Sequence, residues 1–174
     1  MAGKWGVEHF PPFLFTGLRF LMIAAVLVPV IRIQKGQMKY VFAIAMFMGA
    51  LHFAAFYGGM ALAGDVSVIA VAIQLGVPFS TIMSVLFLGE VIGWNRTLGI
   101  TLAFGGVVVM SFDPRVFQYI DAVGLATLAA LMGAIATIFM KRIKDVGVFQ
   151  LQGWIALLSF PVLFSISAVV EADH

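Results

Sequence analysis

Six apolar runs follow one another along the chain, and only short polar links separate them. The runs cover Phe13–Val30, Tyr40–Leu62, Val66–Leu88, Thr97–Phe112, Val123–Met140 and Phe149–Val170. A helix needs about 20 apolar residues to cross a hydrocarbon core of about 30 Å, and these runs have roughly that length. The pattern therefore predicts an all-α fold, a polytopic transmembrane helical bundle of about six spans. Because the links are short, we expect successive helices to be antiparallel neighbours.

The composition supports a membrane protein and argues against several other classes. Of the 174 residues, 63% are hydrophobic and 10% are charged, and the mean hydropathy is +1.11. A soluble domain carries about 25% charged residues, so a soluble fold is excluded. The net charge is +2 without a basic cluster outside the apolar runs, so we expect a lipid bilayer and no nucleic acid as partner. The chain has no cysteine, which excludes disulfides and thiol chemistry.

Lysine and arginine positions predict the orientation, because cytoplasmic loops carry an excess of both. Seven of the ten basic residues fall on one side of the predicted spans: Arg32, Lys35, Lys39, Arg96, Lys141, Arg142 and Lys144. We expect this side to be cytoplasmic in a multi-pass protein of the cell (inner) membrane. Both ends of the chain then face outward. An outward start without a signal peptide indicates that a helix precedes Met1, so we expect this chain to be a fragment of a longer protein.

The third apolar run contains the most informative local feature. Pro78 lies in its middle and has no N–H for the carbonyl four residues back, which belongs to Gln74. Transmembrane helices tolerate such a proline when other groups satisfy the carbonyl. We therefore expect a polar side chain and an unpaired backbone acceptor at one depth in an otherwise apolar helix.

His52 lies about twelve residues into the second run, about 18 Å deep at about 1.5 Å per residue. Ionisable residues inside the membrane are costly and usually functional. Counted from the outer turn, His52 and Gln74 share a depth on antiparallel neighbours, with Phe56 one turn from His52. Thr81 is expected on the same helix face as Gln74. Either these residues and Pro78 line one solute cavity, or His52 and Gln74 bind each other across a packed interface.

Small residues recur every fourth position on two runs. They are Ala50, Ala54 and Gly58 on the second, and Ala126, Ala130 and Ala134 on the fifth. Such ladders let transmembrane helices approach closely. They indicate either a homodimer interface or packing inside the bundle, and we favour the packing.

Several segments together resemble the EamA-like branch of the drug/metabolite transporter superfamily. They are His9-Phe-Pro-Pro with Gly17-Leu-Arg-Phe20, Val77-Pro-Phe with Phe87-Leu-Gly-Glu90, and Leu98-Gly-Ile with Gly105-Gly106-Val-Val-Val. Asp113-Pro-Arg and the run from Val123-Gly-Leu then look like the start of a second repeat. The resemblance implies part of a ten-helix fold of two inverted five-helix repeats. On it, residues 1–114 form the first repeat without its opening helix, and residues 115–174 form the first two helices of the second.

The resemblance also implies a function, a permease that exports small metabolites such as amino-acid-like solutes by alternating access. Arg19 matches a position where family members also carry Arg, and we expect it to position the helix rather than to contact solute. Glu90 is expected at an inner helix turn, where it pairs with Arg96 or caps a helix end.

Two other functions remain open. The first is a non-transporting subunit or a half-transporter that acts through helix–helix assembly. The second is a membrane-embedded enzyme, which the sequence does not support because it lacks His-Glu-x-x-His and Gly-x-Gly-Asp. His9, His52 and His174 are too dispersed for a local metal motif. We therefore expect no enzyme activity, no metal and no cofactor.

Overall fold

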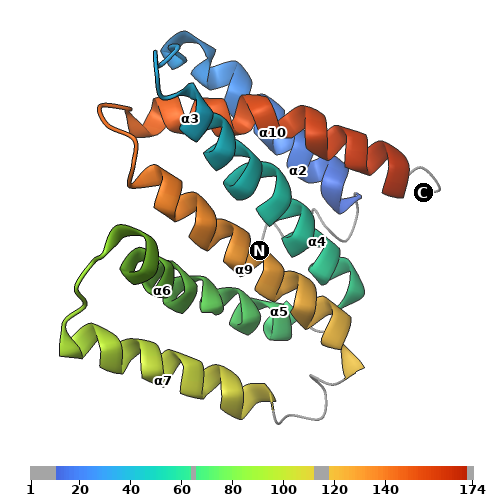
Figure 1. Ribbon diagram of the computed structural model, residues 1–174. Helices are drawn as coiled ribbons and strands as arrows, with labels where there is room; N and C mark the ends of the chain where they lie inside the picture. Colours follow the sequence, from blue (N-terminus) through green and yellow to red (C-terminus); the bar gives the residue numbers. More distant parts are fainter. Residues whose placement is uncertain (1–10, 64–65, 112–117, 172–174) are drawn as a thin grey trace. The chain divides into compact units, whose positions relative to one another are not determined.

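The computed structural model describes residues 11–63, 66–111 and 118–171, which contain helices and no strand (Figure 1). Five helical stretches in these ranges are long and apolar enough to cross a membrane. They are Pro12–Val30, Met38–Leu62, Val66–Leu88, Ile120–Met140 and Val148–Val170. The prediction of an all-α, multi-span fold is confirmed.

The fourth predicted span is the least apolar of the long helices in the described residues. Its residues form helix α7 (Trp94–Ser111), which is not among the five stretches. The helix begins three residues before the apolar run, so its first turn contains Asn95 and Arg96. These two side chains lower the mean hydropathy of an 18-residue helix. Phe112, the predicted end of the run, lies outside the described residues.

The chain divides into two compact units. The first contains residues 1–54 and 139–174, and the second contains residues 55–138. Helix α4 (His52–Leu62) and helix α9 (Ile120–Met140) have residues in both units. The predicted boundary between sequence repeats, at residues 114 and 115, is a different division and stays a prediction.

In the first unit, α10 (Val148–Val170) runs antiparallel along α2 (Pro12–Leu27) and its 3₁₀ extension η1 (Val28–Val30) (Figure 1). Glycines make the close approach possible at both ends. A Cβ on Gly17 would lie 3.3 Å from the Phe164 ring, and one on Gly153 would lie 2.9 Å from Ile31 Cγ1. At both glycines a large side chain of the neighbouring element packs directly against the helix backbone, as small residues in membrane helices allow.

The beginning of α2 is capped from the far end of the chain. The Glu171 carboxylate accepts hydrogen bonds from the backbone N–H groups of Phe13 (2.8 Å) and Leu14 (3.1 Å). Ser167 Oγ donates to the same carboxylate over 2.6 Å. The first N–H groups of a helix have no partner within it, and negative charge is favourable there. Glu171 therefore joins the end of α10 to the start of α2.

The second unit is built on a small cluster of buried residues. Ile69 and Ala72 of α5 (Val66–Ala72) pack with Ala122 and Ala126 of α9. A Cβ on Gly59 would lie 3.0 Å from the Ala122 carbonyl oxygen, so α4 also approaches α9 closely. The small residues of the fifth run, which we expect to pack inside the bundle, are confirmed as buried. The exposed fractions of Ala126, Ala130 and Ala134 are 0–2%.

The ladder predicted on the second run is fully buried only at its first member, because Ala54 and Gly58 are half-buried. Ala50 is buried, but the next small buried residues are Ala55 and Gly59, not Ala54 and Gly58. The reason is a π-helical segment, η2 (Ala45–Leu51), between α3 (Met38–Ile44) and α4. Its wider turn holds one extra residue, which shifts the buried positions after it by one.

Candidate functional site

The π-helical segment η2 ends directly before His52, the histidine that the sequence predicts in a solute cavity. The backbone N–H of His52 donates to the carbonyl of Phe47, five residues back. One extra residue turns everything after it by about 100° relative to an uninterrupted α-helix. π-turns are rare and often mark functional sites. The direction of the His52 side chain therefore depends on this segment.

A contact with α10 explains why the second span departs from α geometry at Ala45. Ser159 Oγ donates a hydrogen bond of 3.0 Å to the carbonyl of Ala45, the first residue of η2, and both residues are fully buried. A side chain that takes a helix carbonyl disturbs the backbone ladder. Gly49 leaves the room for this contact, because a Cβ there would overlap the Ser159 hydroxyl.

His52 itself belongs to a row of rings in the first unit. Its imidazole meets the Phe53 ring edge-on at 5.2 Å between centroids, and Phe53 meets Phe20 of α2 in the same way at 5.2 Å. Phe20 is 2% exposed, whereas His52 is half-buried. Edge-to-face contacts of this kind stabilise ring pairs by about 0.5–1.5 kcal/mol. They hold the imidazole next to the α2–α4 contact.

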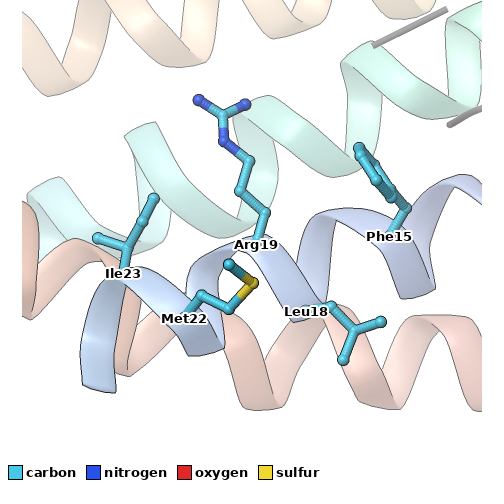
Figure 2. Close-up of a pocket in the computed structure, with 5 residues that line it drawn as sticks. All are labelled: Phe15, Leu18, Arg19, Met22 and Ile23. Atoms are coloured by element: carbon cyan, nitrogen blue, oxygen red, sulfur yellow. The ribbon is translucent and has the colours of Figure 1, made fainter. Parts of the chain in front are cut away.

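Arg19 lines a cavity of about 530 Å³ on α2, together with Phe15, Leu18, Met22 and Ile23. Figure 2 shows its guanidinium extending away from the helix between Phe15 and Ile23. The side chain is exposed, and no described residue forms a hydrogen bond or ion pair with it. The sequence placed Arg19 correctly in the first apolar run, but the cavity around it could not be predicted.

The proline feature in the third run takes a different form from the predicted one. A 3₁₀ turn, η3 (Ile73–Leu75), separates α5 from α6 (Gly76–Leu88), so Pro78 falls in the first turn of α6. The Gly76 N–H donates to the carbonyls of Ile73 and Gln74. The 3₁₀ bond of this turn ends on Ile73, and the Gln74 carbonyl shares the same N–H group, so it is not left without a donor.

The Gln74 side chain lies in a groove of about 550 Å³ between the third run and α7. The groove is otherwise lined by Val71, Val77, Ala103, Gly106 and Val107, so Gln74 is its one polar side chain among the described residues. Gln74 is exposed there. Its amide supplies two donors and one acceptor in apolar surroundings.

Pro78 and Thr81 differ from Gln74 in their burial, because Gln74 is exposed. Both are buried, and Thr81 is 2% exposed. Its hydroxyl donates to the Val77 carbonyl over 3.0 Å and accepts from Arg96 Nη2 over 3.4 Å. The expectation that Thr81 shares a face with Gln74 stays a prediction. Both residues lie towards α7, Gln74 in the groove lined by Ala103 and Gly106 and Thr81 at its bond to Arg96.

Of the other predicted site residues, Phe56 lies against a packed hydrophobic cluster and Glu90 lies at the end of a helix. Phe56 packs against the Ile69–Ala126 cluster of the second unit. Glu90 follows Gly89, which ends α6 in the left-handed conformation (φ 66°), and its N–H donates to the Ser84 carbonyl over 3.4 Å. This is a Schellman-type end. The pairing of the Glu90 carboxylate with Arg96 stays a prediction.

The candidate residues thus offer an imidazole, an amide and a guanidinium among aromatic and aliphatic side chains. Among the described residues, no three histidine, aspartate or glutamate side chains lie together in a way that would hold a metal ion. His52 and Arg19 belong to the first unit, and Phe56, Gln74, Pro78 and Thr81 belong to the second.

Residues 1–112 match the model of the EamA-like transporter family. The chain belongs to this family. It is 24% identical over 98% of its length to a "Probable amino-acid metabolite efflux pump" of Escherichia coli, and 26% identical over 98% to a protein of the same name in Salmonella typhimurium. An "Uncharacterized transporter" of Archaeoglobus fulgidus is 30% identical over 82% of the chain. The chain spans 52–60% of the length of these relatives. No solved structure matches it.

Proposed function

We propose that this chain is part of a carrier in the cell (inner) membrane that exports small amino-acid-like metabolites by alternating access. The observation that carries this proposal is the family match over residues 1–112 in a chain with five helices able to span a membrane. Two relatives that cover 98% of the chain have names that refer to amino-acid metabolite efflux. Family membership also argues against an enzyme, because carriers form no covalent bond with their solute.

His52 and Gln74 are the polar contacts that we propose for the solute. Both are placed by departures from α geometry, His52 by the π-helical segment η2 and Gln74 by the 3₁₀ turn η3. Broken or distorted helices near the midplane are typical of solute sites in secondary transporters. In this proposal Phe56 and Thr81 support the helices that carry His52 and Gln74, and Pro78 holds the turn that exposes Gln74.

Export from cells tests the proposal. Cells that express the complete reading frame are loaded with a labelled amino acid, and efflux is followed in wild type, His52→Ala and Gln74→Ala. One lost hydrogen bond of about 1.4 kcal/mol corresponds to about tenfold in binding, so we expect each variant to export several-fold more slowly at low internal solute. Gln34→Ala, in the link after η1, is the matched control.

Unchanged export by both variants would exclude His52 and Gln74 from the solute path. Absence of export by the wild type, together with a stable homodimer in detergent, would instead favour the half-transporter or assembly subunit.

A further inference from the structure

The Arg19 cavity continues into a second cavity along the same helix. The second has a volume of about 400 Å³, shares Met22 and Ile23 with the first, and reaches Val26, Leu27, Phe149 and Gln152. From Phe15 to Leu27 the two follow twelve residues of helix, or about 18 Å. We call this combined feature the α2 groove. Its described lining has one charged group, Arg19, near one end.

We propose that the α2 groove binds an organic carboxylate, with Arg19 holding the carboxylate and the apolar part of the solute lying over Met22 and Ile23. This deepens the proposed function and rests on it, since it names the class of solute. Other described lining residues are apolar except Gln152 at the far end of the second cavity. A solute that fits this arrangement is an amino-acid-like acid with an apolar side chain.

The charge of Arg19 requires an explanation in this environment. It lies seven residues, or about 10 Å, inside the start of a 19-residue stretch able to span a membrane. An arginine at such a depth is costly unless it is paired or reaches the interface. In Figure 2 the guanidinium is not bent back towards Phe15 and the start of the helix, as reaching the near interface would require.

The shape of the guanidinium suits an oxyanion such as a carboxylate or a phosphate. Its planar fork donates two parallel hydrogen bonds to the two oxygens of a carboxylate. The volumes of the two cavities, about 530 and 400 Å³, lie within the range of small-molecule sites. A phospholipid offers a similar combination of an oxyanion and an apolar body, and the experiment must separate the two sources.

Binding to the purified protein from the complete reading frame tests the proposal without requiring transport. Leucine and leucinamide are the probes, because they differ only in carboxylate and carboxamide. We expect Arg19→Gln to weaken leucine binding by about tenfold or more while leucinamide changes little, as loss of a charge-assisted pair predicts. Arg19→Lys keeps the charge but not the fork, so it should fall between the two. Arg142→Gln, at an exposed arginine after α9, is the control.

Other outcomes would overturn the proposal. Equal losses for leucine and leucinamide would make Arg19 a helix-positioning residue, as the sequence suggested. An effect of Arg19→Gln that depends only on phosphatidylglycerol, compared with phosphatidylcholine vesicles, would assign the groove to lipid. Wild-type protein that binds neither probe would also refute this site. Export that persists in that case would leave the proposed function standing, whereas leucine binding without export would refute the function and keep the site.

Discussion

Substitution of Gly49 by alanine should destabilise the first unit more than any other glycine-to-alanine change within it. The added Cβ would overlap the Ser159 hydroxyl and lie 2.8 Å from Ser159 Cβ and 3.0 Å from Ile155 Cγ2. Rotation of the Ser159 side chain moves the hydroxyl but not its Cβ. Relief therefore requires a shift of α10 or of the π-helical segment.

The magnitude follows from two costs and one gain. Overpacking a tight interface costs about 1–3 kcal/mol. Displacing the Ser159 hydroxyl breaks its 3.0 Å bond to the Ala45 carbonyl and leaves buried groups unsatisfied, which costs about 1–3 kcal/mol. Alanine gains about 0.5–1 kcal/mol over glycine in a helix. We expect a net loss of about 3 kcal/mol.

Unfolding by increasing SDS in mixed micelles, followed by tryptophan fluorescence, measures the loss. Ser159→Gly removes the two Ser159 atoms that the new Cβ would meet and leaves Ile155 Cγ2 in place. Gly49→Ala combined with Ser159→Gly should therefore lose less stability than the two single changes together. A coupling of at least about 1 kcal/mol is expected for residues in contact. Gly99→Ala on α7 is the control, because a Cβ there meets nothing within 4 Å. Additive losses, or equal stability of Gly49→Ala and wild type, would refute the α10–η2 contact.

Two further substitutions test other contacts by the same unfolding measurement. Glu171→Gln keeps the shape of the cap on α2 but removes its charge, and it should cost about 1 kcal/mol; an unchanged midpoint would contradict the cap. Gly89→Ala should cost about 1–2 kcal/mol because only the left-handed backbone opposes it. Gly89→Asn, which tolerates that conformation, should recover part of the loss, and equal losses for both variants would argue against backbone strain as the cause.

Much of the fold could be predicted because it depends on local sequence. A run of about 20 apolar residues specifies a membrane helix wherever it occurs, and five such runs became helices of sufficient length and apolarity. The exception was also local. The first turn of α7 includes Asn95 and Arg96, which lie just before the apolar run that begins at Thr97.

The contacts that place the site depend on residues far apart in the sequence. Ser159 is 114 residues from Ala45, and Glu171 is 158 residues from Phe13. No spacing rule connects such pairs, so neither the π-helical segment nor the cap on α2 could be anticipated. The Pro78 feature was half predictable. A proline in a membrane helix indicates a local distortion. The sequence around Pro78 does not determine which donor the Gln74 carbonyl will bind.

The single extra residue in η2 decides which side chains of the second span act together. With uninterrupted α geometry, the small residues at 50, 54 and 58 would share a face. In the structure the buried small residues from position 50 onward are Ala50, Ala55 and Gly59. The same offset of about 100° applies to His52. The hydrogen bond from Ser159 to the Ala45 carbonyl, for which Gly49 leaves room, therefore influences the direction of the His52 imidazole. The helix face that His52 occupies is therefore found by counting residues from the π-helical segment and not from the start of the span.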